Sequence, residues 1–584
     1  MYPRAAINNT CLVERSCGCA APIDRRCNWS FVAPCLFPHA PEPPPPGYTT
    51  PLASNREAMV LSTVPADSRV KDSPSEAHHV SSTVYGNSLA RNGIRRFELP
   101  EQELPATVVQ RFISDELLLD GNPALNLASF VTTYQEPEAE RLMLANLSKN
   151  FIDVEEYPSM GEIETRCVNI VARLTYLDPS LFNAPLTDHK AEALGVSTIG
   201  SSEAIILAVL AAKRRWQIKR RAEGKSTEKP NLVMNAAVQV CWEKAARYLE
   251  VEERYWYCRP EAYVMDPKEC AELCDENTIL VCAILGTTYT GQYEDIKGIN
   301  DEVAKVNKEK GLDVHIHVDG ASGGFVAPFV MPDLEWDFRL PLVCSINASG
   351  HKYGLAYAGV GWLVFREKKY LPDEVVFTVN YLGSPQSSFT LNFSKSGVQV
   401  LGQYYQFLRL GRSGYESIMS NLTCTADYLS QQVLKLGGGD LFELMSETEG
   451  RGLPLVAWRI VKADVGFDEF AIAGHLRQRG WIVPAYTMAP HTDQMKMLRV
   501  VVREDFSRSR CEQFVRDLKH TVEYLSKAPK VVAEALAGKT PHEVDQDAEK
   551  QSEHHPASHA AKTKHVEHEK HSLRGKHKKT HAVC

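Results

Sequence analysis

Val314-His315-Ile316-His317-Val318 is a short apolar run that is followed directly by a carboxylate, Asp319. Comparable β-rich runs occur at residues 231–235, 278–285 and 360–365. The longer segments between them carry apolar residues at helical spacing, most clearly at residues 202–221. Short strands that alternate with helices predict a mostly parallel sheet with crossover helices. The expected fold class is therefore α/β.

The composition changes along the chain and predicts several regions. A later block has strands near 453–461 and 497–502 and helices near 468–478 and 511–524, which predicts a smaller α+β domain. Residues 1–95 contain a proline run and are rich in Ser, Pro, Asn and Arg, which is typical of disorder. We expect a disordered extension at 1–95, a helical arm at 96–123, a large domain at 124–422, a small C-terminal domain at 423–530 and a tail at 531–584.

The overall composition is that of a soluble globular protein. Of the 584 residues, 44% are hydrophobic and 24% are charged, and 65 Lys+Arg against 73 Asp+Glu give a net charge of −8. A mildly acidic chain lacks the basic face that nucleic-acid binding needs, and no apolar run reaches the roughly 20 residues that span a bilayer. The 15 cysteines show no zinc-site spacing with histidine. We therefore expect no nucleic-acid, membrane or metal partner, and a reducing, cytoplasmic compartment.

A lysine and an aspartate carry the clearest chemical signal. Ser349-Gly350-His351-Lys352 places an amine in a turn between two predicted strands. An amine there can form a Schiff base with an aldehyde, and pyridoxal phosphate is the usual biological aldehyde. Asp319 ends a predicted strand, where open α/β sheets bind ligands, and the pyridine nitrogen of that cofactor needs a carboxylate partner. Alone, Lys352 would be a solvated charge and Asp319 a turn residue, but together they indicate a pyridoxal-phosphate site in which the small Ala321 lies under the ring.

Two serines at the start of a helix could hold the phosphate. Thr198-Ile199-Gly200-Ser201-Ser202-Glu203-Ala204 opens the helix predicted at 202–221. A helix N-terminus offers free backbone N–H groups and a partial positive charge, and Ser201 and Ser202 add hydroxyl donors. A plain capping box is the alternative, and it would use the same donors.

These motifs are accompanied by others in a fixed order. They lie at residues 120–123, 126–133, 155–158, 166–169, 200–204, 286–291 and 498–503. From about residue 96 to residue 526, the chain resembles the plant-type glutamate decarboxylases, which depend on pyridoxal 5'-phosphate. The resemblance implies the fold of the aspartate aminotransferase type (type I), with the cofactor in the large domain. It also implies a lyase that converts L-glutamate to 4-aminobutyrate and CO2, acting as a homodimer or homohexamer with active sites shared across the dimer.

The resemblance implies a role for each matching residue. Lys352 bonds the cofactor as a Schiff base, Asp319 pairs with the pyridinium nitrogen, and either Lys352 or His351 returns a proton to the substrate carbon. The phosphate is held by Ser201, Ser202, Ser349, His351 and, from a neighbouring subunit, Ser394. Around the cofactor ring lie Gln239, Thr288 and Ala321. The substrate carboxylates are expected at Ser129, Phe130, Asp153 and Arg499, partly across the dimer; bacterial relatives have threonine in place of Ser129, which keeps the hydroxyl.

Two rival interpretations fit parts of this pattern. The first is a related decarboxylase that acts on aspartate or an aromatic amino acid. The carboxylate-binding elements around Ser129, Phe130 and Arg499 favour an acidic substrate instead. The second is a cofactor-binding scaffold without activity, which the intact Lys352, Asp319 and Arg499 disfavour.

The two ends of the chain carry separate hypotheses. Met59-Val60-Leu61-Ser62 resembles the usual beginning of plant-type members, so we expect residues 1–58 to be an upstream addition or a misassigned start, with a transit peptide as the alternative. Plant-type relatives often end in a calmodulin-binding helix with a tryptophan, but the last tryptophan here is Trp481, and residues 541–584 have too little apolar surface for such binding. Their nine histidines, eight Lys/Arg and seven Asp/Glu instead suggest a pH sensor whose formal charge rises from +1 to +10, or a plain solvated tail.

Overall fold

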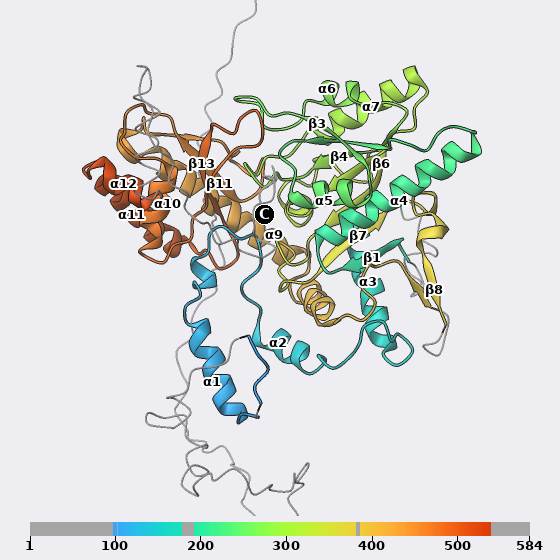
Figure 1. Cartoon of the computed structure of the whole chain (residues 1–584), viewed down its shortest axis with the longest axis horizontal. Helices are drawn as coiled ribbons and strands as arrows, with labels where there is room; N and C mark the ends of the chain where they lie inside the picture. Colours follow the sequence, from blue (N-terminus) through green and yellow to red (C-terminus); the bar gives the residue numbers. More distant parts are fainter. Residues whose placement is uncertain (1–96, 102, 178–191, 381–385, 539–584) are drawn as a thin grey trace, which may run out of the picture. The chain divides into compact units, whose positions relative to one another are not determined.

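A seven-stranded, mostly parallel sheet forms the centre of the large domain, as the alternation of strands and helices predicts. Its strand order is β1-β7-β6-β5-β4-β2-β3, drawn from teal through green to yellow in Figure 1. The strand pairs from β6 to β3 are parallel, whereas β7 is antiparallel to both β6 and β1. The strands are β1 (Gly195–Thr198), β2 (Asn231–Asn235), β3 (Glu252–Trp256), β4 (Thr278–Ile284), β5 (Ile316–Asp319), β6 (Val343–Ala348) and β7 (Gly361–Phe365).

The computed structural model describes residues 97–101, 103–177, 192–380 and 386–538. The chain divides into two compact units between Val108 and Val109, and all that follows concerns the second unit, in which α1 (Ala106–Leu117) ends. The predicted extension at 1–95 and residues 539–584 of the predicted tail lie outside the described residues. Helix α12 (Lys530–Leu536) occupies the first part of the region predicted as tail.

Different helices cover the two faces of the large sheet. Successive strand residues point to opposite faces, and in β2 the side chains of Leu232 and Met234 pack into one buried cluster while that of Val233 packs into another. The first cluster includes residues of α4 (Ser201–Ala222) and α5 (Val240–Tyr248). The second includes residues of α3 (Pro158–Leu174), α6 (Pro267–Glu272), α7 (Ile296–Lys310) and α9 (Val398–Leu434).

A second, four-stranded antiparallel sheet forms the small α+β domain, in orange in Figure 1. Its strand order is β10 (Phe442–Leu444), β11 (Leu455–Ile460), β13 (Lys496–Val501) and β12 (Ala485–Thr487). Helices α10 (Glu469–Arg477) and α11 (Arg508–Leu525) begin where capping predicts, because the side chains of Asp468 and Ser507 accept hydrogen bonds from the backbone N–H groups of Ala471 and Arg510.

The remaining described elements are shorter. They include α2 (Pro137–Leu144), α8 (Ala327–Val330) and the strand pair β8 (Phe377–Val379) and β9 (Gln386–Ser388). The long helix α9 contains a break at Gly411, whose backbone has a φ of 57°, a left-handed conformation that glycine adopts without the Cβ clash of other residues. Helix α9 continues past residue 422. The domain boundary predicted at that residue stays a prediction.

Most predicted elements are present, with small shifts in their ends. Strand β2 spans the predicted residues 231–235, whereas β5 begins two residues later than expected and includes Asp319. The sequence pattern predicts no residue range for β3, or for β6, the strand that precedes the Lys352 turn, because β3 is an edge strand with three charged residues and β6 contains the polar Ser345 and Asn347.

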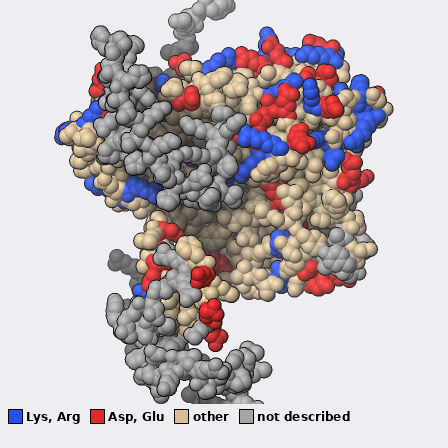
Figure 2. Space-filling model, in the orientation of Figure 1, with Lys and Arg blue, Asp and Glu red and all other residues tan. Residues whose placement is uncertain are grey.

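Acidic and basic side chains are interspersed over the large domain on the face shown in Figure 2, and several form pairs, such as Arg215 with Asp313. A search of the described residues finds no helix with the length and apolar character needed to cross a membrane.

Candidate active site

A cavity of about 540 Å³ lies where the carboxyl ends of the large-sheet strands meet the start of α4. Open α/β sheets bind ligands at this edge, and the volume is in the range of small-molecule sites. The turns after β2, β4, β5 and β6 and the segment at 126–131 form its walls. Eleven of the predicted site residues line it: Ser129, Phe130, Ser201, Ser202, Gln239, Thr288, Asp319, Ala321, Ser349, His351 and Lys352.

Asp319 is held in place by three hydrogen-bond donors. Its Oδ2 accepts from Trp242 Nε1 at 2.8 Å, and its Oδ1 accepts from the backbone N–H of Ala321 at 3.1 Å and from Asn347 Nδ2 at 3.2 Å. The carboxylate lines the cavity although the residue is only 6% exposed. These three donors fix the orientation of a carboxylate that lines the cavity, where it could pair with a pyridinium nitrogen.

Lys352 brings a buried amine to the wall of the cavity. It lies in the turn between β6 and β7, as predicted, and its Nζ donates to Ser322 Oγ at 3.1 Å. Burial lowers the pKa of this ammonium group, while the charge of Asp319 opposes the change. A lowered pKa increases the share of neutral amine, which is the nucleophilic form.

The N-terminus of α4 forms the third part of the cavity. The N-cap position is Gly200, which has no side chain to cap with, so the capping-box alternative is wrong for Ser201 and Ser202. Instead Ser201 Oγ forms a hydrogen bond with Ser349 Oγ across the cavity wall. The 22-residue helix directs its positive end here, and a Cβ on Gly200 would lie 3.1 Å from His351 Cε1.

His351 adds a neutral, unpartnered ring nitrogen beside these serines. Its Nδ1 is buried and has no hydrogen-bond partner within the described residues. Burial, aided by the charge of Lys352, lowers the pKa of His351 to about 4. The imidazole is therefore neutral at physiological pH, and its Nδ1 could form a hydrogen bond with a bound molecule.

Gln239 and Thr288 complete the ring-binding walls. Gln239 is the N-cap of α5, where its Oε1 accepts from the backbone N–H of Cys241 at 2.7 Å. This bond fixes the amide group at the cavity surface. Thr288 follows β4 and lines the cavity, and its carbonyl oxygen accepts a hydrogen bond from Arg499.

Arg499 lies behind the cavity wall rather than on it. Its guanidinium donates to the carbonyl oxygens of Thr288 and, at 2.8 Å, Ala128, and its Nε has no partner. The guanidinium carbon lies 5.0 Å from the centre of the Phe130 ring, and Lys352 Nζ lies 5.2 Å from the same centre. The Phe130 ring, which lines the cavity, is therefore in contact with the buried Arg499 guanidinium behind it.

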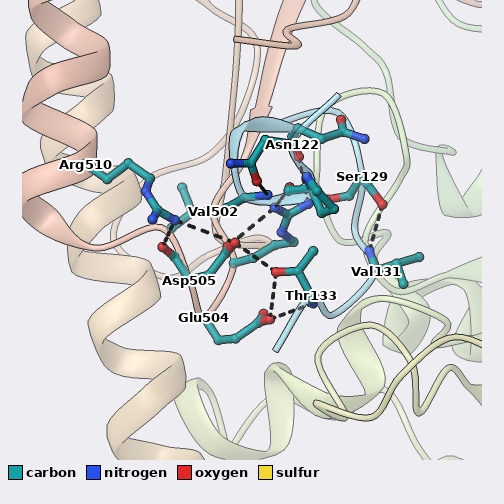
Figure 3. A network of polar contacts seen from close by, with 12 residues as sticks. Asn122, Ser129, Val131, Thr133, Val502, Glu504, Asp505 and Arg510 are labelled. Carbon is teal, nitrogen blue, oxygen red and sulfur yellow. Dashed lines mark hydrogen bonds and ion pairs between the residues drawn. The ribbon is translucent and has the colours of Figure 1, made fainter. Parts of the chain in front are cut away.

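A second buried arginine fastens the segment that carries Ser129 and Phe130. Arg503 Nη1 donates to the carbonyl oxygens of Asn126 at 2.7 Å and Ser129 at 3.0 Å, and Nη2 donates to that of Pro123 at 3.0 Å. Figure 3 shows the rest of this network, in which Asp505 accepts from Arg503 at 3.4 Å and from Thr133 Oγ1 at 2.8 Å. We call Arg503 with its three carbonyl acceptors and Asp505 the Arg503 clamp.

Comparisons with known proteins show the family of this chain. The family profile described as "Pyridoxal-dependent decarboxylase conserved domain" matches residues 100–461. This chain belongs to the pyridoxal-dependent decarboxylases. A glutamate decarboxylase of Petunia hybrida is 51% identical over 78% of this chain and 88% of its own length, and one of Aliivibrio fischeri is 43% identical over 76% and 93%. The structure of a Lactobacillus brevis glutamate decarboxylase superposes with a TM-score of 0.71 at 40% identity, covering 76% of this chain and 98% of that chain.

The cavity of this decarboxylase fits pyridoxal phosphate, the cofactor of the family. The buried Asp319 carboxylate suits a protonated pyridine nitrogen, and the Lys352 amine suits an aldehyde. The positive end of α4, with Ser201, suits a phosphate. The orphaned Nδ1 of His351 points to a group that the protein alone does not supply.

Two predicted site residues of the decarboxylase lie away from the cavity of their own chain. Ser394 Oγ accepts from Asn150 Nδ2 at 3.4 Å, and the backbone N–H of Asp153 donates to the Asn150 carbonyl oxygen at 3.2 Å. Asn150 therefore holds both residues close together, outside the cavity lining. Their predicted roles, which depend on a neighbouring subunit, stay predictions.

Sequence reasoning missed several residues that the structure places at the site. Trp242 and Asn347 donate to Asp319, Ser322 accepts from Lys352, and Arg503 holds the Ser129 segment. Trp242 and Asn347 lie within a few residues of recognised motifs. However, only their contacts across the fold distinguish them from ordinary core residues.

Proposed function

We propose that this pyridoxal-dependent decarboxylase converts L-glutamate to 4-aminobutyrate and CO2. The main support is the identity of about half of the residues over most of both chains to glutamate decarboxylases from plants, such as 51% to that of petunia and 50% to one of Arabidopsis thaliana. The cavity adds support, since it joins an amine, a carboxylate and a phosphate-binding helix end in one space. An aromatic or aspartate substrate remains the second candidate to be tested in the same assay.

Pyridoxal phosphate supplies an aldehyde that bonds an amine and a conjugated ring that accepts the electron pair released with CO2. Lys352 is the residue that would bond it, and the substrate amine would take the place of that lysine. Asp319 would pair with the ring nitrogen, because three donors fix its carboxylate in one orientation at the cavity. Ser201, Ser202, Ser349 and His351 hold the phosphate, and Gln239, Thr288 and Ala321 confine the ring.

The proton that replaces the lost carboxyl group comes from Lys352 Nζ rather than from His351. For the protein alone, burial and the charge of Lys352 lower the pKa of His351 to about 4, so its imidazole is neutral and is a weaker acid than an ammonium group formed on Lys352 would be. The Lys352 amine lines the same cavity as Asp319 and would be free to take up a proton once the substrate had displaced it. His351 then acts as a phosphate ligand through its unpartnered Nδ1.

The substrate carboxylates bind on the side of Ser129 and Phe130. Arg499 provides the positive charge of this wall, and its Nε is the donor that its backbone partners leave unused. Asp153 and Ser394 complete the site of a neighbouring subunit, so the active form is a homodimer or a larger assembly of dimers.

The nine cysteines of the described residues are free thiols, which supports a cytoplasmic location.

A Lys352→Ala variant tests the assignment together with a substrate panel. The wild-type enzyme should show visible cofactor absorbance that borohydride traps on Lys352, and the variant should lose both the trapped adduct and CO2 release. Glutamate, aspartate and an aromatic amino acid should be compared for CO2 release. An unchanged spectrum in the variant, or faster release from aspartate or the aromatic substrate, would contradict the proposal.

A further inference from the structure

Asn347 joins the two ends of the cofactor site through one amide group. It lies on β6 and is fully buried. Its Nδ2 donates to Ser201 Oγ at 3.0 Å, which belongs to the phosphate end, and to Asp319 Oδ1 at 3.2 Å, which belongs to the pyridine end. Both N–H bonds of the amide are thereby used.

His317 fixes the orientation of that amide. Asn347 Oδ1 can only accept, and it lies 2.7 Å from His317 Nε2, so Nε2 carries the ring proton. The other ring nitrogen, Nδ1, then accepts from the hydroxyl of Ser345 at 2.8 Å. His317 is completely buried, and this burial lowers its pKa and keeps the ring neutral.

The direction of these hydrogen bonds determines what faces the cavity. Because Ser201 Oγ accepts from Asn347, its own O–H is left to donate outward to an anionic oxygen or to Ser349. Asp319 Oδ1 is likewise occupied by Asn347 and by the Ala321 N–H, which holds the carboxylate in one orientation. A buried network in which each polar atom has its partner is rigid.

We infer that Asn347 is a positioning residue that sets the phosphate donor and the pyridine carboxylate at the same time. The inference rests on the cofactor site of the proposed function. It assigns Asn347 no contact with the cofactor, because Asn347 is absent from the cavity lining. Its loss should therefore weaken the binding of the ring and of the phosphate together.

Asn231 is a matched control. It is also a fully buried strand asparagine, its Nδ2 donates to Asp275 at 2.9 Å, and its Oδ1 accepts from Thr278 at 2.7 Å. It lies at the first position of β2, at the strand end opposite to the cavity. The two asparagines thus have the same kind of hydrogen-bond partners, but only the partners of Asn347 belong to the active site.

The test uses the full-length wild-type protein and the variants Asn347→Ala, Asn231→Ala and Ser201→Ala, each after removal of the cofactor. The dissociation constants of pyridoxal 5'-phosphate and of pyridoxal, which has no phosphate, are measured from the absorbance of the lysine-bound chromophore. For Asn347→Ala we expect a rise of about ten- to a hundredfold for pyridoxal phosphate and about tenfold for pyridoxal. Ser201→Ala should affect only the phosphorylated ligand, and Asn231→Ala should leave both within about threefold.

Asn347→Asp keeps the test decisive if the alanine variant does not fold. Its carboxylate has the same shape but faces Asp319 with an acceptor, so cofactor affinity should be low at pH 8 and recover as the pH falls. Affinities that match those of Asn231→Ala, or a loss confined to one of the two ligands, would overturn the inference. Because substrate is absent, tight wild-type binding without CO2 release from glutamate would contradict only the proposed function.

Discussion

The Arg503 clamp allows a quantitative prediction about the wall of the substrate pocket. Arg503 is 1% exposed, and its guanidinium makes four hydrogen bonds, three to the carbonyl oxygens of Pro123, Asn126 and Ser129 and one to Asp505. In Arg503→Met, the apolar side chain fills part of the space. The three carbonyl oxygens and the Asp505 carboxylate lose the hydrogen bonds that Arg503 donates to them. Removing one member of a buried charged network costs about 3–5 kcal/mol.

That cost need not unfold the whole protein. The segment at 123–131 can move into water, where its carbonyl oxygens are hydrated, and this movement carries Ser129 and Phe130 away from the cavity. Because hydration of the carbonyl oxygens offsets part of the cost, we expect Arg503→Met to raise the KM for glutamate by about 10- to 100-fold, which corresponds to about 1.4–2.8 kcal/mol. Arg503→Lys should be intermediate, because an ammonium group cannot span the same set of acceptors as a planar guanidinium.

The assay combines steady-state CO2 release with urea unfolding. Arg141→Met is the matched control, since Arg141 is an arginine on the exposed surface of α2 whose ion pair with Glu138 is worth about 0–1 kcal/mol. The control should match the wild type in KM and in unfolding midpoint. If Arg503→Met also matches the wild type in both, the clamp does not hold the pocket wall and the reasoning is refuted.

Three further predictions concern pH. Burial lowers the pKa of His315 from 6.5 to about 4, so the unfolded chain takes up a proton that the folded chain does not between these values; stability should fall as the pH drops from 6.5 to 4, and His315→Gln should flatten this slope in melting temperatures taken at each pH. Burial raises the pKa of Glu294 from 4.5 to about 7, so the folded chain holds a proton that the unfolded chain has lost, and stability should fall as the pH rises through this window. Glu294→Gln should remove that loss of stability. A dependence of melting temperature on pH equal to that of the wild type would count against this prediction. If the histidine-rich tail senses pH, truncation before Pro541 should shift the pH profile of CO2 release, whereas coincident profiles would leave the tail without this role.

The parts of the site that the sequence predicts are those encoded by neighbouring residues. Asp319 ends an apolar strand and Lys352 sits in a turn after Ser349-Gly350-His351, so both positions can be recognised within a few residues. Ser201 and Ser202 begin a helix, which is also a local property. The cofactor site was accessible to sequence reasoning for this reason.

The contacts that hold those residues are long-range. Trp242 lies 77 residues before its acceptor Asp319, and Thr133 lies 371 residues before Glu504, to which it donates. No spacing rule connects such pairs, since the fold alone brings them together. The residue range of strand β6 could not be predicted for a related reason: its Ser345 and Asn347 interrupt the apolar pattern because they form the buried network with His317.

This division separates chemistry from substrate choice. The groups proposed to bond and orient the cofactor stand at the edge of the large sheet and at the start of α4. The groups expected at the substrate carboxylates stand on a segment near the N-terminus, on β13 of the small domain and at Asp153, which lies outside the cavity of its own chain. Substitutions near Asp319 or Lys352 should therefore abolish every reaction of the cofactor. Substitutions in the Arg503 clamp should instead change which amino acid is decarboxylated, because they move the wall that selects the substrate and leave the cofactor site intact.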